Sequence, residues 1–301
     1  MSLSRNELQD LLLAGRIAYL TLDRIIPRVK AGVSIASLYD SIVNLITKTK
    51  CADLAFPPNI SIDECAAHDT AAPNEKRIIP KKGLVKIDLG ANVNGMLSDV
   101  ARTISIDGKH SRLIKAAEQA LENAIDIIRP GIRVTEIGAT VQDTIESYGY
   151  KPIANLTGHA MKKGHLHAGL SIPSVKSLGV VRRGKLKPGM IVAIEPFSTN
   201  GTAGYIEDAS KPPLIYSLQE QAQSQIGQLL INRFGKLPFS LRSATLYLQS
   251  KNKKTTNLAK ILDQDRFHGY RPLVEKSGGL VAQAEHTVLV TKKSARIITK
   301  S

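Results

Sequence analysis

Two strand-like runs joined by a short turn place the strongest constraint on this chain. The runs are Leu84-Val-Lys-Ile-Asp-Leu-Gly90 and Met96-Leu-Ser-Asp-Val-Ala-Arg-Thr-Ile104, and Ala91-Asn92-Val93-Asn94-Gly95 between them is typical of a β-hairpin. A turn centred on Val93-Asn94 places Asp88 directly opposite Asp99. Like charges in that arrangement destabilise a sheet. We therefore expect positive charge between the two carboxylates, and a metal cluster is the natural candidate.

Three more residues of this chemical kind follow along the chain. Glu195 lies in Ile191-Val-Ala-Ile-Glu-Pro-Phe, and Glu285 lies in the strand pattern of residues 280–290. An unpaired carboxylate inside such an apolar strand is costly. His159, in Asn155-Leu-Thr-Gly-His-Ala, would by itself more often be a structural histidine. Asp88 and Asp99 as an isolated pair are also compatible with solvated residues beside a turn.

Taken together, the five residues supply four carboxylates and one imidazole, and no thiolate. This donor set favours Mn, Fe or Co and tolerates Zn. It offers too many ligands for a single catalytic zinc with an open position. Two ions bridged by carboxylates, about 3.5–4 Å apart, fit the set better.

Composition narrows the class of protein. The chain has 301 residues, 43% hydrophobic and 22% charged, which describes one large or two ordinary globular domains. We expect no membrane span and no secretory signal, and therefore a cytoplasmic protein in which Cys51 and Cys65 are reduced. The net charge of +15 is compatible with RNA or acidic partners, but no RNA-binding motif supports them, and a solvated surface is the simpler interpretation.

Apolar spacing predicts helices over residues 4–29, 35–48, 110–129 and 135–147, with Ser4 and Glu7 at capping-box spacing in the first. Residues 210–268 differ, because they are polar, helical in pattern and without a group of candidate ligands. We expect a catalytic domain of residues 1–209 and 269–301, interrupted by a helical insertion subdomain of residues 210–268.

The ordered series Asp88, Asp99, His159, Glu195 and Glu285 resembles the ligand set of the methionine aminopeptidases and their pita-bread relatives. Three strings carry the resemblance: residues 54–68 ending in Ala-Ala-His68, residues 155–169, and Gln283-Ala-Glu-His-Thr287. It covers residues 4–295, and the long separation of Glu195 from Glu285 is similar to the archaeal-like type II branch. The resemblance implies an α+β pita-bread fold, in which helices cover a mostly antiparallel sheet that carries a helical insertion subdomain.

The resemblance also implies roles for the five ligands. Asp88 would hold one divalent ion, Asp99 and Glu285 would bridge two, and His159 and Glu195 would hold the other. The ions would be Co, Mn, Fe or Zn. A water or hydroxide bridging them would attack the first peptide bond, so that N-terminal methionine is removed from nascent proteins with a small second residue.

Further residues match catalytic and substrate-binding positions of the family. Glu195 would accept and donate protons, His167 would stabilise the tetrahedral intermediate, and His68 would contact the scissile group from the opposite side. The substrate-binding set implied by the resemblance is Phe56, His68, Leu166, His167 and Tyr270. The implied partners are nascent polypeptide N-termini, with ribosome association through the basic surface as a hypothesis, and the protein would be a monomer.

Two other functions remain open from the residues. An X-Pro aminopeptidase or prolidase shares the five-ligand scaffold, but such relatives carry an additional N-terminal domain, and fewer than ninety residues precede Asp88 here. A non-catalytic pita-bread protein that binds nucleic acid or protein would have lost ligands. All five ligands are present in this chain, as are His68 and His167, which favours catalysis.

Overall fold

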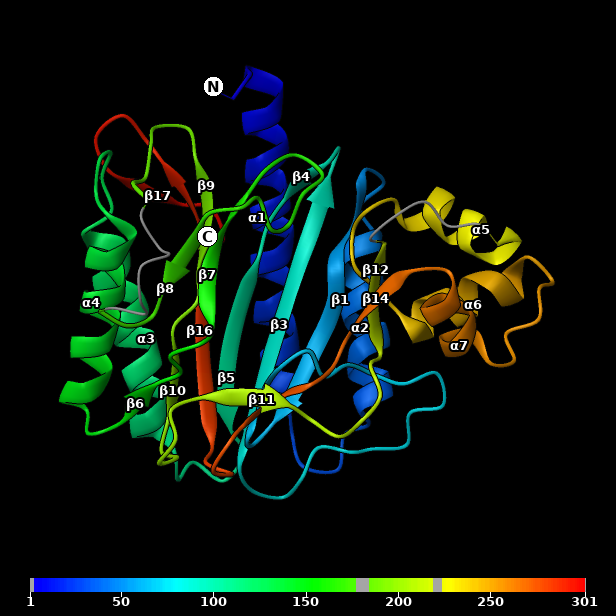
Figure 1. The fold of residues 1–301 in the computed structure, drawn as a ribbon, viewed down its shortest axis with the longest axis horizontal. Coiled ribbons are helices and arrows are strands. Elements are labelled where there is room, and N and C mark those ends of the chain that lie inside the picture. The colour runs from blue at the N-terminus through cyan, green and yellow to red at the C-terminus, as the bar shows by residue number, and fades with distance from the viewer. Residues whose placement is uncertain (1–2, 177–183, 219–223, 301) are drawn as a thin grey trace.

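The chain begins with two helices that pack against one face of a large β-sheet (Figure 1). The computed structural model describes residues 3–176, 184–218 and 224–300. Helix α1 is Arg5–Ile25, the 3-10 turn η1 is Ile26–Arg28, and helix α2 is Ile35–Thr47. The predicted capping box is confirmed, because the Ser4 hydroxyl accepts a hydrogen bond from the Glu7 N–H and the Glu7 carboxylate accepts one from the Ser4 N–H.

The predicted hairpin is present, with its turn one residue later than expected. Its strands are β3 (Leu84–Val93), β4 (Met96–Leu97) and β5 (Val100–Ser105). The two turn residues are Asn94 and Gly95, with φ of 52° and 89°. A two-residue hairpin turn of this kind needs positive φ at both positions, which Asn-Gly accepts and a β-branched valine resists.

This register changes the relation between the two aspartates. Asp88 pairs with Ala101, so Asp99 lies two positions from the residue directly opposite Asp88. The prediction that the two carboxylates face each other directly is therefore wrong. They are diagonal neighbours on the same face of the sheet, at a separation that still allows side chains to interact.

Over the described residues, eleven strands form one sheet in which every pairing is antiparallel, with the path β1-β3-β5-β16-β9-β7-β8. The other strands of this sheet are β1 (Ala52–Ile62), β6 (Lys151–Pro152), β7 (Thr157–Met161), β8 (Ser171–Pro173), β9 (Ile191–Ile194), β10 (Phe197–Thr199), β16 (Val281–Val290) and β17 (Ala295–Ile297). A second sheet joins β2 (Cys65–Ala67), β11 (Ile206–Asp208) and β15 (Leu273–Glu275).

Side chains alternate between the two faces of the main sheet, as strand geometry requires. On β3, Val85, Ile87 and Leu89 pack into the apolar cluster formed with α1 and α2. On β16, Ala282 and Val288 pack into the cluster formed with α3 (Ser111–Asp126) and α4 (Val134–Ser147). These residues make up an apolar face of the sheet that the helices cover. The residues between them on both strands point to the opposite face.

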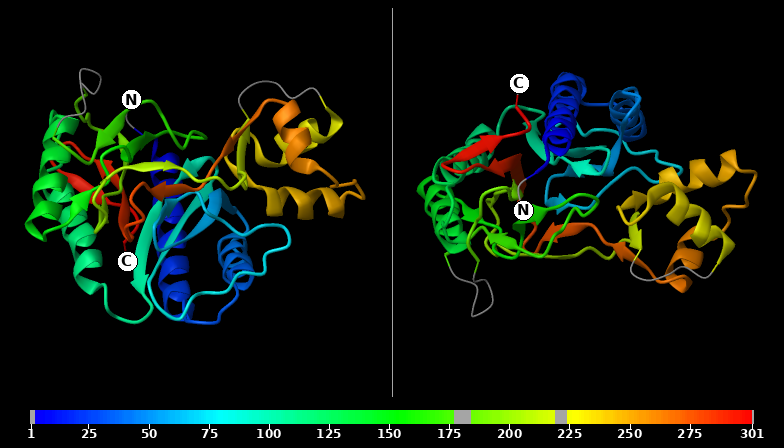
Figure 2. Two further views of the ribbon diagram at one scale, coloured as in Figure 1. Left: turned by 60° about the horizontal axis from the view of Figure 1, so that its bottom comes forward. Right: turned by 90° about the horizontal axis from the view of Figure 1, so that it is seen from above.

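The helices cover the sheet in two pairs, α1 with α2 and α3 with α4 (Figures 1 and 2). The predicted helices over residues 110–129 and 135–147 correspond to α3 and α4, whose actual ends differ by up to three residues. The expected α+β architecture, a mostly antiparallel sheet covered by helices, is confirmed. Within the described residues, no helix is both long and apolar enough to cross a bilayer.

The segment of residues 210–268 stands to one side of the main sheet (Figure 2). It holds helices α5 (Gln225–Phe234), α6 (Leu241–Ser250) and α7 (Leu258–Gln264), together with strands β12 (Ile215–Leu218), β13 (Phe239–Ser240) and β14 (Phe267–Tyr270), the last of which ends just outside it. The expectation of a helical segment is therefore incomplete. Aromatic residues on the short strands, among them Tyr216, Phe239 and Phe267, join the helices in a separate apolar cluster.

Polar contacts dock this segment onto α2. The buried Tyr39 hydroxyl lies 2.7 Å from the Ser240 hydroxyl and 2.8 Å from that of Ser243. The Arg242 guanidinium donates to both carboxylate oxygens of Asp40, at 3.1 and 2.8 Å. Bidentate pairs of this kind fix orientation as well as position.

The contact of α1 with the C-terminal residues gives a test of the packing. A Cβ atom on Gly15 would lie 2.4 Å from the Ile298 carbonyl oxygen. We expect Gly15→Ala to lower the free energy of unfolding by about 1–3 kcal/mol through overpacking, although alanine favours helix by about 1 kcal/mol. Urea unfolding followed by circular dichroism measures this. The neighbouring exposed Arg16→Ala should change stability little, and equal stability of both variants would contradict the packing.

Candidate metal centre and pocket

A cavity of about 490 Å³ lies on the side of the sheet opposite the helices. Every site residue predicted from the sequence lines it: Phe56, His68, Asp88, Asp99, His159, Leu166, His167, Glu195, Tyr270 and Glu285. Segments that are far apart in sequence therefore contribute to one site. Strand alternation accounts for the candidate ligands on strands, because Asp88, His159 and Glu285 alternate with residues of the helix-covered apolar clusters.

The five candidate ligands come from neighbouring strands. Asp88 lies on β3, Asp99 between β4 and β5, His159 on β7, Glu195 directly after β9, and Glu285 on β16. The His159 Nε2 atom is 3.5 Å from Asp99 Oδ2 and 3.6 Å from Glu195 Oε1. One ligand atom from each of Asp99, His159 and Glu285 lies within 4.8 Å of the others. Such a cluster is compact enough to surround cations.

Burial and mutual repulsion raise the pKa values of the carboxylates. Burial is the larger cause for Asp88, Glu195 and Glu285, whose pKa values lie well above the ordinary range, and neighbouring carboxylates add to it. The pKa of Asp99 is raised to about 7, again mainly by burial. Burial also lowers the pKa of His159 to about 4, so that its imidazole is neutral and able to donate a lone pair.

Several polar atoms of this cluster are buried without a hydrogen-bond partner: Asp88 Oδ1, Asp99 Oδ1, His159 Nδ1 and Glu285 Oε1. Buried polar atoms of folded proteins are normally satisfied, so a group of orphaned acceptors needs an explanation. Divalent cations would supply the missing positive charge to the three orphaned carboxylate oxygens, and the oxygen-rich donor set suits Mn, Fe, Co or Zn. The residues present therefore fit a divalent-metal site.

His68 directly follows strand β2 in a conformation that the surroundings fix. Its φ is 62°, and its N–H donates to the Asn59 side-chain oxygen at 2.7 Å. Burial, with the nearby His167 as a smaller cause, lowers the pKa of His68 to about 4, so its ring is neutral at pH 7. The Tyr270 ring packs against His68 edge-on, with 5.4 Å between centroids.

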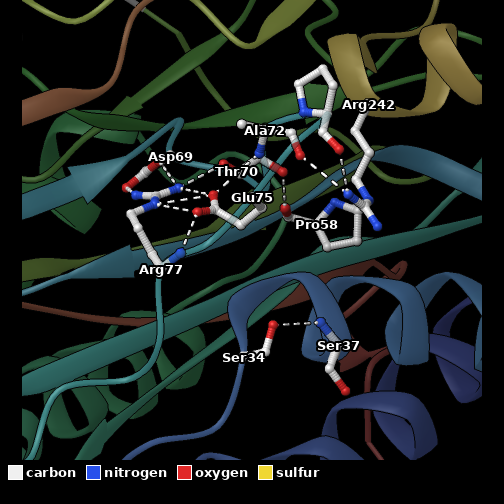
Figure 3. Close-up of polar contacts among 10 residues, drawn as sticks. Ser34, Ser37, Pro58, Asp69, Thr70, Ala72, Glu75, Arg77 and Arg242 are labelled. Carbon is white, nitrogen blue, oxygen red and sulfur yellow. Dashed lines mark hydrogen bonds and ion pairs between the residues drawn. The ribbon is translucent and has the colours of Figure 1, made fainter.

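The loop that follows His68 is held by two arginines, as Figure 3 shows. Arg77 donates to the Asp69 and Glu75 carboxylates and to the Thr70 carbonyl. Arg242 donates to the Ala72 and Pro73 carbonyls at 3.2 and 3.0 Å. Because Arg242 belongs to the segment of residues 210–268, this segment supports the loop next to His68 as well as contributing to the pocket wall.

His167 and the apolar residues complete the pocket. The His167 ring lies 4.4 Å from that of His159, between centroids. Phe56 and Leu166 are buried in an apolar cluster with Met161 and Met96. Phe56 and Leu166 therefore form an apolar wall next to the polar cluster, an arrangement that can hold an apolar side chain of a ligand.

One contact of the site was missed by reasoning from the sequence. The Gln283 amide lies within hydrogen-bonding distance of both Asp88 and Glu285. Gln283 stands two positions before Glu285, so the period of two along a strand places both side chains on one face and could have identified it. By the same rule His286 points to the other face, and its Nδ1 lies 2.9 Å from the Thr299 hydroxyl.

Comparisons with known proteins agree over almost the whole chain. The profile of metallopeptidase family M24 matches residues 9–292. The methionine aminopeptidase of Saccharolobus solfataricus is 36% identical over 306 residues, which cover 99% of this chain and 100% of that protein.

Two solved structures share the fold. The methionine aminopeptidase of Thermotoga maritima superposes with a TM-score of 0.73 at 20% identity, covering 100% of this chain and 99% of that one. A thermophilic Arx1 superposes with a TM-score of 0.84 at 16% identity, covering 99% and 91% of the two chains. At such low identity these two likenesses establish the fold alone.

The raised carboxylate pKa values predict how stability depends on pH without metal. In an unfolded chain histidine has a pKa of about 6.5 and is mostly neutral above about pH 7.5, and folded His159, with its pKa lowered to about 4, is neutral as well, so between about pH 7.5 and 8 the carboxylates dominate. A folded-state pKa raised above the unfolded value gives stability that is lost as pH rises through the folded pKa. With a chelator present, we expect the midpoint of thermal unfolding to fall across this range.

Added Mn(II) should abolish that fall, because the cations neutralise the same carboxylates. The control is Asp99→Asn, which removes one ionisable group and should flatten the profile in chelator. Thermal melts at several pH values with chelator or Mn(II) make the comparison. A midpoint that does not depend on pH in chelator would contradict the cause given for the raised pKa values.

Proposed function

The chain belongs to metallopeptidase family M24, and from this premise we propose that it removes the N-terminal methionine from polypeptides as a methionine aminopeptidase. The observation that carries the proposal is 36% identity to a methionine aminopeptidase over its full length, together with the metal-ligand candidates and an apolar pocket in one cavity. The antiparallel sheet covered by helices agrees with the pita-bread fold that the resemblance implies.

We propose that the site holds two divalent ions. Asp88 would hold one, Asp99 and Glu285 would bridge both, and His159 and Glu195 would hold the other. Bound cations supply Lewis acidity toward the scissile carbonyl and toward water. The orphaned oxygens on Asp88, Asp99 and Glu285 support this arrangement, and Co, Mn, Fe or Zn satisfies the donor chemistry.

The protein's own residues would orient the substrate and move protons. Glu195, beside the cluster at the end of β9, would accept a proton at its carboxylate during attack and return it to the leaving amine. His167 would donate a hydrogen bond to the oxygen that becomes negative in the tetrahedral intermediate. His68, whose backbone N–H is held by Asn59 and whose ring packs against Tyr270, would contact the scissile group from the other side of the cavity.

Substrate selection would follow from the shape of the cavity. Phe56, Leu166 and Tyr270, with His68 and His167, would enclose the methionine side chain. The second residue would then lie against the charged cluster, where a large side chain has no space. Overpacking of a rigid site is costly, so small second residues would be preferred.

The setting of this activity is also a proposal. The substrates would be nascent polypeptide N-termini in the cytoplasm, and the enzyme would act as a monomer. The net charge of +15 supports ribosome association, which should weaken steeply as salt rises. Residues 210–268 would form an insertion subdomain within a catalytic domain of residues 1–209 and 269–301, which their separate apolar cluster supports.

Peptide hydrolysis tests the proposed activity and its alternative. Purified enzyme should release methionine from Met-Ala-Ser more than about tenfold faster than from Met-Leu-Ser, because only the small side chain fits. Ala-Pro-Ser, a substrate for X-Pro enzymes, should not be cleaved. Chelator should abolish release, and Co, Mn, Fe or Zn should restore it to different extents. Preferential cleavage of Ala-Pro-Ser would refute methionine specificity.

The role of His167 can be separated from metal binding. His167→Ala should lower kcat by about 100- to 1000-fold, the usual effect of losing a group that stabilises an oxyanion. Bound metal, measured by plasma mass spectrometry, should remain unchanged. His165→Ala, the same substitution at a residue of this loop that is not among those lining the cavity, is the matched control and should leave kcat unaltered. Loss of metal from the His167 variant would show that His167 is a ligand instead.

A further inference from the structure

Gln283 is a buried amide in contact with two carboxylates of the candidate metal centre. It is only 1% exposed and lies on β16, two residues before Glu285. Its Nε2 atom is 3.1 Å from Glu285 Oε2 and 3.4 Å from Asp88 Oδ2. These two carboxylates belong to strands separated by β5, so the amide spans the sheet face between them.

The chemistry of the side chain fixes its orientation. A carboxylate only accepts hydrogen bonds, and an amide nitrogen has two N–H donors, so the nitrogen end faces Asp88 and Glu285. One carboxylate oxygen of each residue contacts the amide, while Asp88 Oδ1 and Glu285 Oε1 have no protein partner. Gln283 thereby fixes the rotation of both carboxylate groups and leaves the two orphaned oxygens available to a cation.

The backbone of Gln283 is fixed by Thr103 on β5. The Thr103 hydroxyl donates to the Gln283 carbonyl at 2.7 Å and accepts from the Gln283 N–H at 2.8 Å. The buried Lys86 ammonium donates to the Val281 carbonyl, also on β16, at 2.9 Å. These contacts fix the backbone at the beginning of β16 relative to β3 and β5. They therefore also fix the position from which the Gln283 side chain extends.

A second threonine makes the same pair of backbone hydrogen bonds at the other end of the paired part of β5 and β16. The Thr287 hydroxyl accepts from the Asp99 N–H at 2.7 Å and donates to the Asp99 carbonyl at 2.8 Å. Between the contact of Thr103 with Gln283 and the contact of Thr287 with Asp99, residues 284–286 of β16 pair with residues 100–102 of β5. Glu285 therefore lies in a short ladder with a threonine clamp at each end, and Gln283 lies at one clamp.

We infer that Gln283 is a positioning residue that sets the spacing and rotation of Asp88 and Glu285 and thereby determines how tightly the centre binds divalent metal. The inference rests on the proposed function, because it assumes that these carboxylates are metal ligands. A neutral donor suits this task, since it orients both anions without neutralising them. A positive side chain at this position would compete with the cations for the carboxylates.

Metal affinity tests the inference directly. Apo-protein is titrated with Mn(II) by isothermal calorimetry, and the visible absorption of the Co(II)-loaded protein is recorded. Gln283→Met keeps the length of the side chain and removes both hydrogen bonds. It should weaken Mn(II) binding by about 10- to 100-fold, the usual effect of losing a partner of metal ligands, and change the Co(II) spectrum. At saturating Mn(II), KM for Met-Ala-Ser should stay constant while kcat falls.

Two further variants isolate the positioning role. Thr103→Val removes the clamp on the Gln283 backbone and should weaken Mn(II) binding in the same direction, whereas Thr103→Ser keeps the hydroxyl and should restore it. His286→Gln alters the same strand on its opposite face and should leave Mn(II) affinity unchanged. If Gln283→Met does not fold, the comparison of Thr103→Val with Thr103→Ser decides the question.

The outcomes distinguish the inference from the function on which it rests. A wild-type protein that binds no divalent metal would overturn the proposed function. Wild-type binding with equal Mn(II) affinity and an equal Co(II) spectrum in Gln283→Met would overturn the positioning role alone. Weaker binding in Gln283→Met and Thr103→Val, with Thr103→Ser and His286→Gln like wild type, is the result that the structure leads us to expect.

Discussion

Repulsion among four carboxylates on one face of a sheet is the constraint on which the structure of the site depends. In the part of the chain that the structure describes, His159 is the only basic side chain within ion-pair distance of these carboxylates. Burial keeps its imidazole neutral, so it brings no positive charge. The buried ammonium of Lys86, on the same face of β3, donates to the carbonyls of Asp63 and Val281. At neutral pH the group therefore holds protons, as the raised pKa values indicate, unless positive charge from outside the chain replaces them.

The rest of the fold keeps these carboxylates from separating. On the helix-covered side, the apolar clusters fix β3 and β16 and so determine which residues face the cavity. On the cavity side, the contacts that hold individual ligands are polar and specific, such as the hydroxyl of Thr287 on the backbone of Asp99. Apolar packing thus sets the strand positions, and a few hydrogen bonds set the orientation of each charged side chain.

The sequence predicted the helices and the hairpin because their signals are local. The turn was misplaced by one residue because it was centred on Val93-Asn94, although Asn94-Gly95 is the pair that accepts positive φ at both positions. Strands β12 and β14 pair Ser217 with His268, and such short strands joined over a long separation give no periodic signal. The candidate site depended on resemblance, and the contact of Gln283 with Asp88 depends on a register that no local pattern encodes.

The place of β16 in the sheet has a consequence for the order of assembly. This strand comes near the end of the chain, yet it lies between β5 and β9 at the middle of the sheet (Figure 1). The two halves of the sheet, one reaching to residue 105 and the other beginning at residue 151, are therefore joined only when residues 281–290 have been synthesised. Contacts of such high sequence separation form slowly. Glu285 enters the cluster at this step, so a chain growing on the ribosome has an incomplete candidate metal centre until residues 281–290 have been synthesised.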